Sequence, residues 1–117
     1  DDERQAALAA EELRDAEVVA VPTAALCELV WVLRSVYQAP PRQIASALRT
    51  LLAAGNIRHD AVAAEVGLSV LEAGGDFADG AIAASGLALG GSVFLTFDRD
   101  AAALAADAGI ATRVPGQ

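Results

Sequence analysis

The sequence contains no lysine, so its eight positive charges are all arginines, and sixteen acidic residues give it a net charge of −8. A chain this acidic is a poor electrostatic partner for nucleic acid by itself. Contact with phosphate groups would need bound metal ions or a local cluster of arginines. Methionine is also absent, which leads us to expect that Asp1 is not the native start of the protein.

Cysteine and histidine occur once each, as Cys27 and His59. One cysteine excludes an internal disulfide and a thiolate metal cage. A single histidine and a single cysteine provide too few ligands for a typical zinc site and make a Cys–His nucleophile pair an unfavoured interpretation. We expect Cys27 to be a buried, inert thiol and His59 to lie in a loop or at the start of a helix. The P-loop, GxGxxG and GxSxG motifs are absent too.

Aromatic residues are few, so the 55% of hydrophobic residues predict a core built from alanine, valine and leucine. A chain of 117 residues is long enough for one domain with a real core. No segment resembles a signal peptide, so we expect a cytoplasmic location.

Turn residues and apolar periodicity predict helices that alternate with short extended segments. The expected helices cover about 1–16, 24–37, 41–55, 60–74, 76–90 and 98–109. The expected extended segments are 17–21, 56–59, 93–97 and 110–114. This alternation is typical of an α/β fold with a parallel sheet.

The stretch 75–100 carries acids at both ends and no charge between Asp79 and Asp98. Its length invites a transmembrane interpretation, but Gly90-Gly91 divides it and its flanks are acidic rather than basic. We therefore expect a helix, a glycine stop and a strand at 93–97. Five bulky residues in a row suit a strand that is covered on both faces of a parallel sheet.

The acids of this stretch occupy positions where ligands bind in α/β proteins. Asp98 follows the predicted strand, at the carboxyl edge of the sheet. Asp76 and Asp79 are three residues apart, so a helix places both on one face of its first turn. Asp76 is either an N-cap or a functional residue, and the sequence leaves both open. For Asp79 we favour a role in a site over simple stabilisation of the helix dipole.

Glu28 lies in a helix that is apolar nearly all round, and we therefore expect this helix to be buried. A buried carboxylate without a cation would cost several kcal/mol or take up a proton. Glu28 could instead reach the surface or bond to Thr23, the expected N-cap. We favour the interpretation that it points into a polar site.

Glu28, Asp79, Asp98 and, with less weight, Asp76 are expected to converge at one edge of the sheet. Mutually repelling carboxylates without cations require a compensating charge. With oxygen ligands and no histidine or cysteine, Mg²⁺ or Mn²⁺ is the chemically matched choice. Such ions activate water and neutralise a phosphodiester during its hydrolysis.

Three segments, VPTAALCELVWVLR, GGDFADGAIAA and VFLTFDRDAAALA, resemble those of PIN-domain proteins, specifically bacterial VapC-type toxins. The resemblance covers nearly the whole chain in the right order. It implies a three-layer α/β/α sandwich with a central parallel sheet, and Mg²⁺- or Mn²⁺-dependent endoribonuclease activity on RNA. By motif it implies that Glu28, Asp79 and Asp98 are catalytic metal ligands. Asp76 would assist them, and Thr96 would support the strand end.

The family opens with a strand ending in a DTN-like motif whose Asp is a principal metal ligand, and nothing in this sequence matches it. We expect that this strand exists but lies outside this sequence or was cleaved off. The resemblance also implies a homodimer, a VapB-like antitoxin that often inserts an arginine into the acidic site, and no contact with a membrane.

Two other hypotheses remain. The chain could be a catalytically inactive PIN-fold subunit that binds a partner. It could also be a receiver-like domain in which one Asp accepts a phosphoryl group, although the absence of lysine speaks against this because such sites normally pair the phosphoryl oxygens with one.

Overall fold

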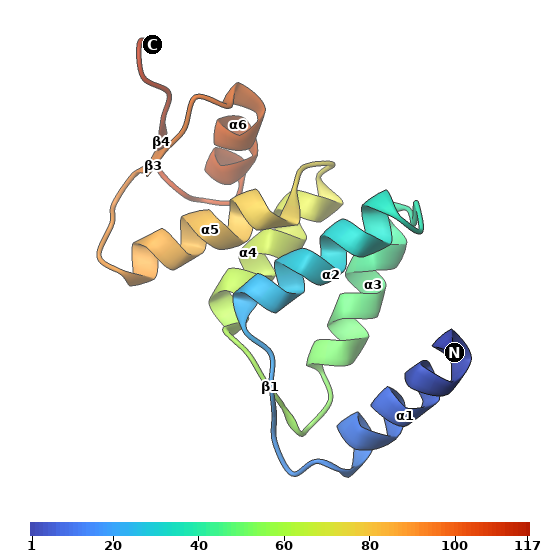
Figure 1. Ribbon diagram of the computed structural model, residues 1–117. Helices are drawn as coiled ribbons and strands as arrows, with labels where there is room; N and C mark the ends of the chain where they lie inside the picture. Colours follow the sequence, from blue (N-terminus) through green and yellow to red (C-terminus); the bar gives the residue numbers. More distant parts are fainter.

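The computed structural model describes residues 1–117 as six helices and four strands of two residues each (Figure 1). The helices are α1 (Asp2–Asp15), α2 (Thr23–Ser35), α3 (Pro41–Leu52), α4 (Ala61–Glu72), α5 (Phe77–Ala88) and α6 (Arg99–Asp107). The strands are β1 (Val19–Ala20), β2 (Ile57–Arg58), β3 (Phe94–Leu95) and β4 (Thr112–Arg113). The order and type of the predicted elements are thus confirmed, with helix ends displaced by up to about three residues.

Helices α2 to α5 enclose the main core. Its largest fully buried side chains are Phe77, Leu26, Ile44, Leu48, Leu68, Leu71 and Val70. Phe77 is the first residue of α5, and its ring lies against Gly67 of α4, where a Cβ atom would stand only 2.6 Å from the ring. Gly80 likewise allows close approach, because a Cβ there would lie 2.8 Å from the carbonyl oxygen of Val66. Gly67 and Gly80 therefore allow α4 and α5 to pack closely. Helix α5 carries Asp76 and Asp79 at its start.

The strands form two separate parallel pairs. Val19 pairs with Ile57 in the first, and Phe94 pairs with Thr112 in the second. The pairs do not join into one sheet, and they lie apart in Figure 1. The α/β class and the parallel pairing agree with the prediction, whereas the central sheet of a three-layer sandwich is not confirmed.

The segment 93–97 differs most from its prediction as a strand covered on both faces. Only Phe94 and Leu95 pair with β4. Leu95 is 62% exposed and Phe97 is 80% exposed. The expected burial on both faces is wrong for this structure, because only the Phe94 side of β3 packs against the neighbouring helices. Leu95 points to the other face, and Phe97 lies beyond the strand, in the turn before α6.

Helix α1 forms where it was predicted, but it does not contact the core. It contains no buried residue, and its two leucines, Leu8 and Leu13, are exposed. Asn56 holds the end of the helix by donating hydrogen bonds from Nδ2 to the carbonyl oxygens of Leu13 (2.6 Å) and Ala16 (3.1 Å). Because α1 projects, the radius of gyration is 15.6 Å, against about 13 Å for a compact domain of this length.

Two helix starts differ in how they are capped. Asp60 caps α4, accepting a hydrogen bond from the Ala63 amide at 3.1 Å. Thr23 is not an N-cap, because Pro22 occupies that position and Thr23 is already helical. None of the helices has the length and apolar character needed to cross a membrane.

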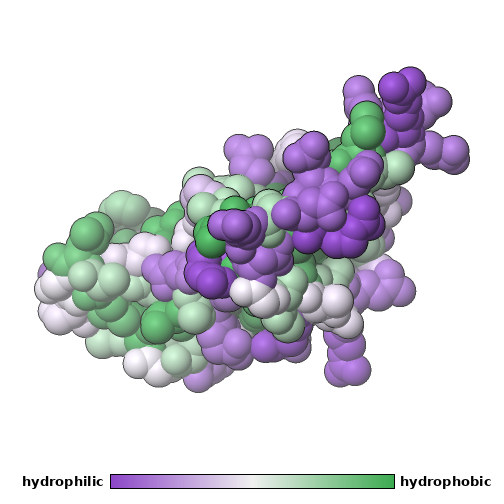
Figure 2. Space-filling model, turned by 90° about the horizontal axis from the view of Figure 1, so that it is seen from below, coloured by the Kyte–Doolittle hydropathy of each residue, from purple (hydrophilic) through white to green (hydrophobic).

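Figure 2 shows that hydropathy is unevenly distributed over the surface. The end formed by α5 and β3 is largely hydrophobic, whereas the opposite end, which carries α1, is hydrophilic. Exposed apolar residues at the hydrophobic end are Ile82, Leu87, Leu89, Val93, Leu95 and Phe97.

Candidate functional site

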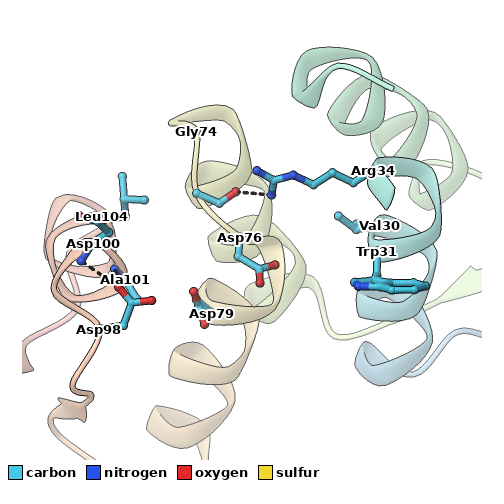
Figure 3. A pocket seen from close by; sticks show the side chains of 11 residues that line it. Val30, Trp31, Arg34, Gly74, Asp76, Asp79, Asp98, Asp100, Ala101 and Leu104 are labelled. Carbon is cyan, nitrogen blue, oxygen red and sulfur yellow. Dashed lines mark hydrogen bonds between the residues drawn. The ribbon is translucent and has the colours of Figure 1, made fainter. Parts of the chain in front are cut away.

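Four aspartates line one open cavity of about 430 Å³ between α2, the start of α5 and the start of α6 (Figure 3). Asp76 and Asp79 belong to the first turn of α5, and Asp98 and Asp100 belong to that of α6. Val30, Trp31 and Arg34 of α2, together with Gly74, Gly75, Ala101 and Leu104, complete the wall. The structure therefore brings together three of the predicted site residues, Asp76, Asp79 and Asp98.

Asp76 and Asp98 each hold the start of a helix. Oδ1 of Asp76 accepts a hydrogen bond from the Ala78 amide at 3.1 Å. Oδ1 of Asp98 accepts two, from the amides of Asp100 and Ala101, both at 3.0 Å. These bonds satisfy free amides of the helix N-termini. In both residues the second carboxylate oxygen makes no hydrogen bond within the protein and is free to bind a cation.

Thr96 positions Asp98 through the backbone. Its Oγ1 accepts a hydrogen bond from the Asp98 amide at 3.0 Å. Thr96 does not line the cavity. Its side chain therefore fixes the turn between β3 and α6, on which the direction of the Asp98 carboxylate depends.

Asp79 has no stabilising partner for its charge. Its side chain makes no hydrogen bond, and none of the ion pairs of the chain involves it. Partial burial raises the pKa of the Asp79 carboxyl above its usual range, and the negative charges of Asp76 and Asp98 raise it further. Because it serves no cap and no ion pair, Asp79 is the acid of the cavity that structural roles explain least.

Arg34 is the single cation in the wall of the cavity, and it does not neutralise these acids. Its Nη1 donates a hydrogen bond to the carbonyl oxygen of Gly75 at 3.0 Å, across from α2 to the loop before α5 (Figure 3). The sequence analysis missed Arg34, Trp31 and Asp100 as cavity residues. Asp100 could have been found from its position two residues after Asp98, whereas the tertiary contact of α2 with this loop has no sequence signal.

Glu28 lines a second cavity, of about 440 Å³, together with Cys27, Trp31, Asp76 and Ala78. Trp31 and Asp76 belong to both cavities, so Glu28 is a neighbour of the aspartates without sharing their cavity. The predicted burial of the helix is wrong, because α2 fully buries only Leu26 and Val30. Glu28 is exposed, which agrees with the alternative that it reaches the surface. Cys27 is half-buried, and desolvation, with a smaller effect of the charge of Asp76, raises the pKa of its thiol.

The donor chemistry of these residues fits a hard divalent cation, because the cavity offers carboxylate oxygens without soft ligands. The geometry is that of an open site. No three acidic, histidine or cysteine side chains stand close enough together to hold a metal ion as they lie. A cation would therefore have to draw the carboxylates of Asp76, Asp79 and Asp98 closer together.

An α/β chain with carboxylates gathered at helix starts around a cavity has the features of a metal-assisted hydrolase. The PIN domain family matches residues 1–107, and the chain belongs to this family. PIN domains are in general metal-dependent nucleases. Comparison with curated proteins and with solved structures gives no match.

Proposed function

We propose that this PIN domain is a Mg²⁺- or Mn²⁺-dependent endoribonuclease of the VapC toxin type. The observation that carries the proposal is the unpaired Asp79 carboxylate, whose pKa is raised between Asp76 and Asp98 in one open cavity. Clustered negative charge of this kind is unfavourable for folding unless a cation binds to it. The motifs around Glu28, Asp79 and Asp98 support the VapC type.

In this mechanism Asp79 and the second carboxylate oxygens of Asp76 and Asp98 would hold the cation, and Glu28 would contribute from the adjoining cavity. When bound, the divalent ion lowers the pKa of water and offsets the negative charge of the phosphodiester. Asp76 and Asp98 are each held at a helix start through one carboxylate oxygen, and their second oxygens would have to move toward the cation. Thr96 contributes by holding the backbone of Asp98.

Asp98→Asn tests this role without disturbing the fold, because asparagine caps a helix as well as aspartate does. We expect at least a 10- to 100-fold loss of RNA cleavage in Mg²⁺, by comparison with what loss of a supporting residue costs in metal enzymes. A fluorogenic single-stranded RNA measures the rate, and circular dichroism checks the fold. Asp107→Asn, at the other end of α6 and outside the cavity, is the matched control. Equal cleavage by both variants would contradict the proposal.

We also propose that an aspartate on an added extended strand completes the ligand set, since no residue here matches the DTN-like motif of the family. Each strand keeps one edge without a strand partner, and Leu95 of β3 is exposed. Such edges readily accept an extended peptide. An apolar peptide ending in Asp-Thr-Asn should tighten Mn²⁺ binding in calorimetry, and the same peptide with Asn for Asp should not. Equal Mn²⁺ affinities with and without the first peptide would dismiss this completion.

The proposed partners are RNA as substrate, a VapB-like antitoxin and a second copy of the chain. The acidic cavity offers charge-assisted hydrogen bonds to an inserted arginine. The apolar end formed by α5 and β3 provides surface for association (Figure 2).

The second candidate is a catalytically inactive PIN-fold subunit. The separation of the carboxylates favours it, because no three of them form a ready ligand group. The calorimetry described above discriminates between the two. Micromolar Mn²⁺ binding that depends on Asp79 supports the nuclease, whereas absence of Mn²⁺ binding even with the strand peptide supports the inactive subunit.

A further inference from the structure

Trp31 is the one tryptophan of the chain, and it is 64% exposed. It lies on α2 directly after the buried Val30 and contributes to the walls of both cavities. In Figure 3 its ring lies on the α2 side of the acidic cavity, with Asp76 and Asp79 on the opposite side. Other aromatic side chains are also exposed, but Trp31 is the one that lines the cavity of the aspartates.

The charge of the chain limits how RNA can be held. The cavity wall has four aspartates and one cation, Arg34, which already donates to the Gly75 carbonyl. Arg49 is occupied by Glu65 and Glu72 on the other side of the core helices. Arg99, between Asp98 and Asp100 at the start of α6, is exposed but does not line the cavity. Contacts of basic residues with phosphate, which dominate most RNA affinity, are therefore limited to Arg34 and Arg99 near the site. Stacking of a base on an aromatic ring needs no cation and contributes comparable affinity.

We propose that Trp31 stacks against an unpaired nucleobase next to the phosphodiester that a cation at the aspartates would hold. This inference rests on the proposed ribonuclease function. Bases inside a duplex are stacked on one another and present no face to a side chain, which excludes duplex RNA as a good ligand. Arg34 follows one helical turn later and lines the same cavity, so one wall combines an aromatic face with a cation.

Because Trp31 is the sole tryptophan, its fluorescence reports on this position alone. A single-stranded hexaribonucleotide is titrated into the full chain, with Ca²⁺ in place of Mg²⁺ to suppress cleavage. We expect saturable quenching by the hexamer, and little quenching by an abasic hexamer with the same phosphates or by the hexamer paired with its complement.

Affinity measurements with variants complete the test. Trp31→Ala should bind the labelled hexamer about 5- to 150-fold more weakly, in line with the loss of one stacked base. Trp31→Phe should recover most of this loss. Tyr37→Ala is the matched control, because Tyr37 is 71% exposed just beyond α2 but lines neither cavity. In Mg²⁺, Trp31→Ala should raise KM for RNA cleavage and change kcat by much less.

Three results would overturn the inference. Equal hexamer affinity of Trp31→Ala and wild type, with RNA cleavage intact, removes the stacking role and leaves the ribonuclease in place. Loss of a dimer in Trp31→Ala, seen as a change in native mass, assigns Trp31 to a protein interface instead. Wild-type protein that neither binds nor cuts RNA in any divalent metal removes the proposed function and the stacking role together.

Discussion

Asp79→Asn is expected to stabilise the metal-free protein at neutral pH and at the same time to abolish RNA cleavage. The charge of Asp79 is disfavoured by partial burial and by the charges of Asp76 and Asp98, and the amide removes this cost. The same substitution removes the carboxylate that we assign to the cation. The loss of cleavage should be on the order of 1,000-fold or more. A substitution that improves folding while it removes function is characteristic of a site residue.

The pH dependence of stability gives an independent check. Because the folded-state pKa of Asp79 is raised, the folded protein binds a proton more readily than the unfolded chain does. Below the unfolded pKa both states are protonated, and the variant and wild type should have the same Tm. As pH rises through the interval up to the folded pKa, wild type loses stability relative to Asp79→Asn. The difference should then stay constant to neutral pH.

Thermal unfolding in EDTA, followed by circular dichroism between pH 3 and pH 7, measures this difference. Asp2→Asn removes an acid from α1, far from the cavity, and should not reproduce the profile. Mn²⁺ should raise the Tm of wild type but not that of Asp79→Asn, because binding to the folded state alone is stabilising. A variant that is less stable than wild type in EDTA, or that still cleaves RNA, would contradict the role of Asp79.

The elements of the fold were predictable because their signals are local. Pro41 begins α3, Asp60 caps α4, and glycines follow α4 and α5, as expected from the sequence. The arrangement of these elements was not predictable from such signals. The apolar residues of 93–97 predict a strand covered on both faces, but covering both faces requires helices on both sides of the sheet, and here only Phe94 packs against helices. Leu8 and Leu13 show the same limit, since an apolar stripe does not specify what it packs against.

The site was predictable only in part, because local signals locate some of its residues and the packing of helices locates the others. Asp76, Asp79 and Asp98 were found because each lies at a helix start or strand end, where parallel topology gathers side chains. Glu28 was expected among them, but α2 buries one face only, and Glu28 lies on the exposed part. Trp31 and Arg34 were missed because their place in the cavity depends on how α2 packs against the loop before α5.

The stabilities of two phenylalanine variants would distinguish the observed packing from one in which β3 is covered on both faces. Phe77→Ala should lower the free energy of unfolding by about 3–5 kcal/mol, because a fully buried ring is lost between α4 and α5. Phe97→Ala should change it by no more than about 0.5 kcal/mol, because Phe97 is 80% exposed. Both variants remove the same atoms, so the difference between them reports burial alone. Urea unfolding monitored by circular dichroism measures both.

A third variant shows whether the Phe77 ring lies where the structure places it. Gly67→Ala puts a methyl group into the space of that ring and should be destabilising by about 1–3 kcal/mol in wild type. In the Phe77→Ala background the obstruction is gone, and the added alanine should improve the helix by about 0.5–1 kcal/mol. The two substitutions should therefore be strongly non-additive. Additive effects of Gly67→Ala and Phe77→Ala would mean that α4 and α5 pack differently. A cost of Phe97→Ala close to that of Phe77→Ala would mean that further structure covers β3.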